Sequence, residues 1–171
     1  MDFKKILALT IIVLAVFSCL SVASAGLFDF LGGDQAKNKT VEFEGFSLSL
    51  PDNAVMINNT TKDNGVTFNQ HVLQYNNGKG DTYLLVLKAN GSGMVNSADE
   101  YKNNWVSNGA KDGGNYSGWS IIQISNSTNH QFNDTLKYLF VKKTNSTFVV
   151  LGAPDLNELK KVSDTFKETK K

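Results

Sequence analysis

The stretch VTFNQHVLQYNNGKGDTYLLVLKA, residues 66–89, decides the fold. Apolar and polar side chains largely alternate from Val66 to Tyr75, which is the period of a β-strand. The polar, glycine-containing run from Asn76 to Asp81 predicts a hairpin turn. Tyr83 to Leu87 then form an unbroken apolar run, as in a strand that is covered on both faces. The stretch therefore predicts two antiparallel strands in the middle of a sheet.

Four other segments have the composition of strands. Each alternates apolar with polar side chains, or forms a short apolar run between turn residues. The polar, glycine-containing segments from Asn58 to Gly65 and from Gly109 to Gly118 are predicted to be loops. The four predicted strands are residues 41–50, 119–125, 132–143 and 147–152.

Two helices are predicted by the signals at their N-termini. Ser97 and Glu100 have the spacing of a capping box, in which both side chains accept hydrogen bonds from free backbone N–H groups. Asp155 is the predicted cap of the last helix. The apolar faces are Tyr101, Trp105 and Val106 in the first helix, and Leu156, Leu159, Val162 and Phe166 in the second.

The predicted elements follow the order of three strands, a helix, three strands and a helix. Runs of strands with helices between them are typical of the α+β class. We therefore expect one antiparallel sheet of about six strands with two helices packed on it. This single domain is expected to span residues 41–171.

The two ends of this domain resemble the PsbP-like fold. In that family a strand with the pattern Phe-x-apolar-x-apolar-Pro opens the domain, as Phe46-Ser-Leu-Ser-Leu-Pro51 does here. A helix with a Ser-Phe pair near its end closes it, and this chain has Thr165-Phe166 in that place. The resemblance covers about residues 46–167 and implies the architecture alone. Its members include a photosystem II extrinsic subunit and a Ran-binding import factor, and no functional residue of theirs carries over.

The first 25 residues have the composition of an export signal. Two lysines precede an apolar run from Ile6 to Leu20, and Ala23-Ser24-Ala25 predicts cleavage between Ala25 and Gly26. The run is close to the roughly 20 residues that a spanning helix needs, so an uncleaved membrane anchor is the alternative. Residues 26–40 form an apolar leader and a polar linker. We expect a protein that is secreted or held at the outer face of the cell membrane.

The charged residues and the cysteine count exclude several classes of function. All 17 cationic side chains are lysine, so the forked contacts that arginine makes with phosphate are not available. Of 17 lysines and 16 acidic residues, 15 of each remain once Asp2, Lys4 and Lys5 are removed, and such a neutral chain argues against nucleic acid. The single cysteine, Cys19, lies in the leader, which excludes a disulfide or thiolate chemistry in the domain.

The sequence contains no recognisable catalytic set, and we expect no cofactor and no metal. His71 and His130 lack a ligand spacing, and a metal site would need a carboxylate such as Asp81 or Asp134 beside both. Asp112 offers oxygen atoms to calcium but lacks the alternating acidic residues of a calcium loop. No serine lies in the Gly-x-Ser-x-Gly pattern of a nucleophile elbow.

Asparagine sequons are frequent in this chain. Each has the form Asn-x-Ser/Thr without proline, which is the acceptor pattern of a glycosylated surface protein, and most fall in predicted loops. Together with the leader and the Lys and Asn usage, they resemble small exported proteins of methanogenic archaea. The candidate glycosylation sites are Asn38, Asn58, Asn59, Asn90, Asn115, Asn126, Asn133 and Asn145.

These observations favour an exported, non-catalytic domain that acts as a binding or accessory module. Its expected partner is a protein or a surface polymer, and membrane association would come from the N-terminal segment. Two alternatives remain open. One is an extracellular hydrolase whose site is assembled from scattered residues, and the other is a carrier of a small ligand or lipid.

Overall fold

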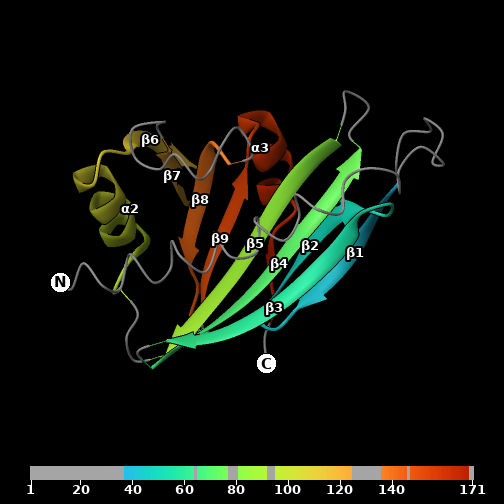
Figure 1. The fold of residues 1–171 in the computed structure, drawn as a ribbon, viewed down its shortest axis with the longest axis horizontal. Coiled ribbons are helices and arrows are strands. Elements are labelled where there is room, and N and C mark those ends of the chain that lie inside the picture. Colours follow the sequence, from blue (N-terminus) through green and yellow to red (C-terminus); the bar gives the residue numbers. More distant parts are fainter. Residues whose placement is uncertain are drawn as a thin grey trace.

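The computed structural model describes residues 37–63, 65–76, 81–91, 95–124, 136–145 and 147–169. Within these ranges the chain forms two antiparallel sheets and two helices (Figure 1). No helix among the described residues is both long enough and apolar enough to cross a membrane. The smaller sheet has the order β1-β2-β10, with β1 at Asn38–Phe43, β2 at Phe46–Pro51 and β10 at Lys167–Glu168.

The larger sheet has seven strands in the order β3-β4-β5-β9-β8-β7-β6. All of its neighbouring strands are antiparallel. Its strands are β3 (Val55–Asp63), β4 (Val66–Asn76), β5 (Asp81–Gly91), β6 (Lys111–Tyr116), β7 (Trp119–Gln123), β8 (Tyr138–Lys143) and β9 (Phe148–Ala153).

The expected α+β architecture, with about six strands in one sheet carrying two helices, is wrong. The described chain is mostly β, and its strands divide between a seven-stranded and a three-stranded sheet. Two segments predicted to be loops belong to the edge strands β3 and β6. Edge strands face water along one side, so they tolerate polar side chains and lack the apolar pattern that reveals a buried strand.

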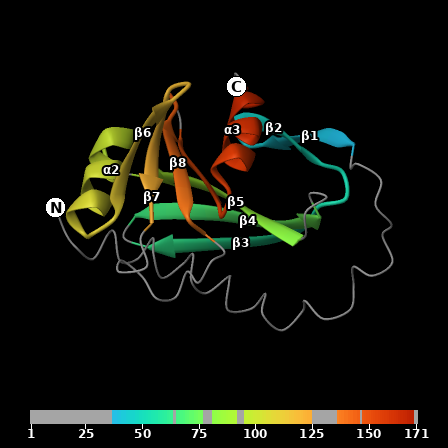
Figure 2. The same ribbon diagram turned by 90° about the horizontal axis from the view of Figure 1, so that it is seen from above.

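The predicted hairpin at the centre of the sheet is confirmed. β4 and β5 pair antiparallel over eleven residues, and residues 84–89 of β5 are all buried between β4 and β9. Leu85 and Leu87 point into the core cluster that also holds α2 (Ala98–Ser107). Leu84 and Val86 point into the cluster that holds β2 and α3 (Leu156–Asp164). Both faces of the central strand are therefore covered. Figure 2 shows α3 and the β1–β2 pair on the same side of the larger sheet.

Both helix caps occur where the sequence predicts them. In α2 (Ala98–Ser107) the Ser97 hydroxyl accepts the Glu100 N–H at 3.0 Å. The Glu100 carboxylate accepts the N–H of Asn96, one residue before the cap, at 2.9 Å. In α3 (Leu156–Asp164) the Asp155 carboxylate accepts two N–H groups of the first turn, at 2.7 and 3.0 Å. These caps fix where each helix begins on the sheet.

Candidate binding pocket

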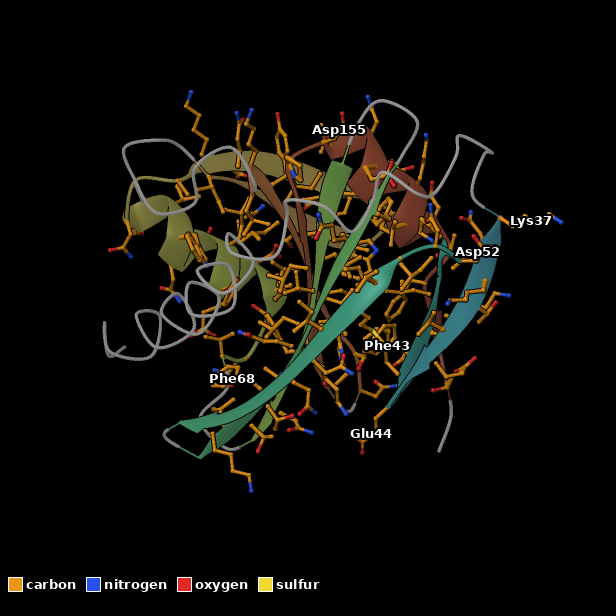
Figure 3. The ribbon with its side chains drawn as sticks, turned by 45° about the vertical axis from the view of Figure 1, so that its right-hand side comes forward. Lys37, Phe43, Glu44, Asp52, Phe68 and Asp155 are labelled. Carbon is orange, nitrogen blue, oxygen red and sulfur yellow. The ribbon has the colours of Figure 1, made fainter. Side chains whose placement is uncertain are left out.

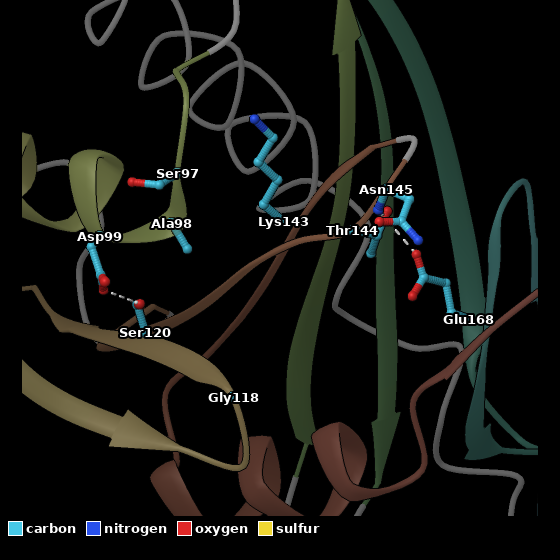
Figure 4. Close-up of a pocket in the computed structure, with 9 residues that line it drawn as sticks. All are labelled: Ser97, Ala98, Asp99, Gly118, Ser120, Lys143, Thr144, Asn145 and Glu168. Carbon is cyan, nitrogen blue, oxygen red and sulfur yellow. Dashed lines mark hydrogen bonds between the residues drawn. The ribbon is translucent and has the colours of Figure 1, made fainter.

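An open pocket of about 600 Å³ lies where α2 begins, between the β6–β7 turn and the β8–β9 hairpin (Figure 4). Its walls carry hydroxyl, amide, carboxylate and ammonium groups, and they are more polar than apolar. A polar pocket of this kind binds through hydrogen bonds rather than by burying apolar surface. The lining residues are Ser97, Ala98, Asp99, Gly118, Ser120, Lys143, Thr144, Asn145 and Glu168.

One wall is held by a hydrogen bond between α2 and β7. The buried Ser120 hydroxyl donates to Asp99 Oδ1 at 2.7 Å. Lys102, one turn further along α2, is also buried, and its Nζ lies 3.2 Å from Asp112 Oδ1 and 4.0 Å from Asp99 Oδ1. Asp99 lies in the first helical turn, where the helix dipole favours a negative charge. These contacts attach the beginning of α2 to β6 and β7.

The opposite wall is the β8–β9 hairpin together with β10. Thr144 Oγ1 donates to the Thr147 carbonyl at 3.2 Å and accepts its N–H at 3.1 Å, which closes the hairpin. The Asn145 N–H donates to Glu168 Oε1 at 3.1 Å, so the smaller sheet also contributes to the pocket (Figure 4). Lys143 Nζ donates to the Asn96 carbonyl at 2.5 Å, which joins this wall to the residue before α2.

The hydroxyl groups of the pocket are not arranged for nucleophilic catalysis. A serine nucleophile is usually paired with a histidine base, and Ser120 instead donates to the weakly basic carboxylate of Asp99, which Lys102 also approaches. Ser97 serves as a helix cap. Within the ranges that the structure describes, no three His, Cys, Asp or Glu side chains gather as metal ligands do. The pocket presents fixed hydrogen-bond donors and acceptors.

His71 lies at the joint between the larger sheet and the smaller one. Its Nδ1 is 2.7 Å from Asn58 Oδ1, and its ring centroid is 4.9 Å from that of Phe43. Burial and the charge of Lys88 lower the pKa of the His71 imidazole. His130, Asp134 and the side chain of Asp81 lie outside the described residues or side chains.

Lys88 is the charged centre of this joint. It is 5% exposed, and its Nζ lies 2.6 Å from Glu44 Oε2, in the turn between β1 and β2. Figure 3 shows Phe43 and Glu44 next to each other at that end of the smaller sheet. A buried ammonium group needs such a partner, so the ion pair helps to hold the two sheets together. The surroundings of His71 are structural rather than catalytic.

The candidate glycosylation sites are mostly in strands, which corrects the expectation that they lie in loops. Exposed strand positions hold three of them, Asn38, Asn58 and Asn115, and Asn145 is exposed in the β8–β9 hairpin. Asn59 lies in β3, and Asn90 is half-buried near the end of β5. The cleavage site at Ala25 and Gly26 and the sequons at Asn126 and Asn133 lie outside the described residues.

The pocket and the two buried lysines, Lys88 and Lys102, were not predicted from the sequence. One available signal was Lys88, a charged residue that follows the apolar run from Tyr83 to Leu87 in a strand predicted to be covered on both faces. A charge at such a position requires a partner from elsewhere in the fold. Ser120 and Asn145 carried no comparable signal, because polar residues at the ends of strands are common.

No family model, curated protein or solved structure matches this chain. The resemblance to the PsbP-like fold therefore stays a prediction.

Proposed function

We propose that this chain is an exported, non-catalytic binding module that holds a polar ligand in the pocket at the start of α2. The observation that carries the proposal is the pocket lining. Its polar groups come from α2, β7, the β8–β9 hairpin and β10, and hydrogen bonds within the protein already fix them. A ligand then binds without ordering those groups, which lowers the entropic cost of association.

The charges of the pocket favour a neutral or zwitterionic ligand. The lining carries two carboxylates, Asp99 and Glu168, and one ammonium group, Lys143. Each of the three already forms a hydrogen bond with another group of the protein. A polyanion would meet two carboxylates, and a polycation would meet the ammonium group. Hydroxyl-rich sugars and peptide amides match the lining best. The leader sequence supports export, which would bring the module to surface polymers of that chemistry.

The same geometry disfavours the extracellular hydrolase. The imidazole of His71 contacts Asn58 of β3 and Phe43 of β1, whereas the Ser120 hydroxyl donates to Asp99, so His71 is not placed as a base for Ser120. Asp99 and Glu168 already accept hydrogen bonds from Ser120 and Asn145. This arrangement supports recognition in preference to bond cleavage.

A ligand titration followed by NMR tests the proposal. The probes are neutral mono- and disaccharides and dipeptides at millimolar concentration, added to the ¹⁵N-labelled protein. We expect selective shifts of the amides of residues 97–99, 120 and 143–145, and their loss in Ser120→Val. Asn115→Ala, on the outer strand β6, is the matched control and should bind normally. If no probe shifts these amides beyond the rest of the spectrum, the pocket is not a site for this class of ligand.

Glycan attachment at exposed sequons would agree with an exported module. Asn38 and Asn115 are exposed and do not line the pocket, whereas Asn145 does, so a glycan there would cover it. We therefore expect modification at Asn38 or Asn115 and none at Asn145. Intact mass and peptide mapping of the native protein show which asparagines carry a glycan. If none is modified, the expectation of glycosylation is wrong.

A further inference from the structure

The beginning of β3 exposes three large apolar side chains. Val55, Met56 and Ile57 are 42%, 40% and 43% exposed, and they are the exposed large hydrophobic residues of the described chain. We call them the apolar edge. β3 is the outermost strand of the larger sheet, so its backbone on that side lacks a neighbouring strand of the sheet. Proteins usually avoid leaving an apolar strand edge open to water.

The described chain enters the domain beside this apolar edge. The Lys37 carbonyl accepts the Asp52 N–H at 2.7 Å, and Lys39 Nζ donates to the Asp52 carbonyl at 3.3 Å. Figure 3 shows Lys37 and Asp52 close together at one end of β1 and β2. Asp52 precedes Val55 by three residues. Two exposed lysines and the point where the N-terminal segment joins the domain therefore lie next to the apolar edge.

The apolar edge and the pocket lie at opposite ends of the strands. Val55 pairs with Gln74, which in turn pairs with Tyr83 near the beginning of β5. Phe148, which begins the strand after the pocket hairpin, pairs with Ala89 near the end of β5. Six residues of β5 separate these two positions, which corresponds to roughly 20 Å along the strand.

We propose that the apolar edge is a membrane-contact surface. The strand β3 enters the interface between headgroups and acyl chains edge-on, so that Val55 and Ile57 on one face and Met56 on the other all contact lipid. Lys37 and Lys39 then lie among anionic headgroups. The proposal rests on the proposed export and on its uncleaved form, in which the apolar run from Ile6 to Leu20 holds the chain at the bilayer; cleavage after Ala25 would release the domain. The domain then stands on its β3 end and presents the pocket away from the membrane.

The tether is what favours a bilayer over a second copy of the chain. In the uncleaved form the apolar run from Ile6 to Leu20 would lie in lipid ahead of Lys37, so the membrane would stay within reach of the apolar edge. Three side chains, each already more than half covered, bury far less than the roughly 1,200 Å² of a stable protein interface. Tethering compensates for a small contact area, because the second contact is intramolecular.

Depth-dependent quenching on vesicles tests this orientation. The full chain carrying Cys19→Ser receives one labelling cysteine, either Met56→Cys on the apolar edge or Asn115→Cys on the opposite edge strand. Each is labelled with the environment-sensitive dye NBD and reconstituted into phosphatidylcholine–phosphatidylglycerol vesicles, with and without doxyl-labelled lipid. We expect several-fold stronger quenching by doxyl lipid at position 56 than at position 115. A third label at Lys39→Cys should lose its quenching when Val55, Met56 and Ile57 are replaced by Ser.

The other occupants of the apolar edge give different results, and each would overturn the proposal. Emission at position 56 that changes with protein density but not with doxyl lipid identifies a second copy. A dye that is shielded equally in the presence and absence of vesicles is covered by the chain itself. If quenching is weak and equal at positions 56 and 115, the apolar edge does not contact the membrane. The same conclusion follows if the chain does not float with vesicles. The NMR titration of the pocket is made in solution, so its outcome is independent of these results.

Discussion

The two edge strands of the larger sheet have opposite characters. β6 carries a register shift between Asp112 and Gly114, and the Asp112 side chain accepts the Gly114 N–H at 2.8 Å and contacts Lys102 of α2. β3 runs through nine regular pairs with β4 and begins with the apolar edge. A bulge and charged side chains are common protections against edge-to-edge pairing. The difference indicates that β6 is closed by contacts that also support the pocket, whereas β3 is left open to a surface outside the domain.

The largest effect is expected from filling the bulge of β6. A Cβ atom at Gly113 would lie 2.5 Å from Ile121 Cγ2 and 3.0 Å from Ile121 Cβ. We expect Gly113→Val to lower the free energy of unfolding by about 2 kcal/mol, because the close approach of β6 to β7 leaves no room. Urea denaturation measures it.

The neighbouring glycine is the control for that substitution. Gly114 has a φ of +80°, and no atom lies within 4 Å of an added Cβ. Gly114→Ala should cost about 1 kcal/mol, which is the backbone strain of a left-handed residue. If Gly113→Val is no more damaging than Gly114→Ala, the bulge is not closed by packing on Ile121.

A pH-dependent effect is expected at the ion pair that supports β6. The Gly114 N–H, followed by Lys102, lowers the pKa of the Asp112 carboxyl. A carboxyl with a lowered pKa in the folded state stabilises the protein above its unfolded pKa and loses this contribution as the pH falls through the folded value. Asp112→Asn should therefore be less stable than the wild type at pH 7, with the difference vanishing below pH 3.8. A difference that is constant from pH 7 to pH 3 would contradict the pairing.

The contribution of His71, which lies beside β3, to stability should decrease in acid. A histidine that pairs with a carboxylate would show the opposite dependence on pH. Its pKa is lowered by burial and by Lys88, so the folded state disfavours the protonated imidazole. Stability is then complete above pH 6.5 and falls as the pH drops through the lowered folded value. Thermal unfolding of the wild type and His71→Gln between pH 8 and pH 4 compares them. Only the wild type should lose this part of its stability, and parallel curves would place His71 in water.

The smallest effect on stability is expected at the apolar edge. Ile57→Thr changes an exposed side chain on a free strand, so the free energy of unfolding should stay within about 0.5 kcal/mol of the wild type. The same substitution should weaken lipid quenching of a dye at position 56. A decrease of several kcal/mol in the free energy of unfolding would mean that Ile57 packs within the domain, and would contradict its role in membrane contact.

Sequence reasoning located the elements that carry their own signal. The strand β5 is apolar on both faces, and both helices begin at capping residues, so those predictions are confirmed. The strand β6, the polar part of β3 from Asn58 and the two-residue strand β10 were missed, because exposed strand residues need not follow an apolar pattern. The pocket was missed for a different reason. The contacts that join its walls to one another and to β10 link residues 21 to 47 positions apart, such as Ser120 with Asp99 and Lys143 with Asn96, and no local pattern predicts such pairs.

Labelling of lysines on intact cells tests most directly the claim that the domain is exported and rests on the membrane with its β3 end. Lysines are spread over the chain, so they report on both ends of the domain. The reagent is an amine-reactive ester that does not cross membranes, and peptide mapping reports each site. The account predicts that the exposed Lys111 on β6 is labelled rapidly on intact cells, whereas Lys37, at the headgroups, is labelled several-fold more slowly until detergent is added. Labelling of neither lysine before lysis would contradict export. Equal labelling of both on intact cells would contradict the membrane contact of the β3 end.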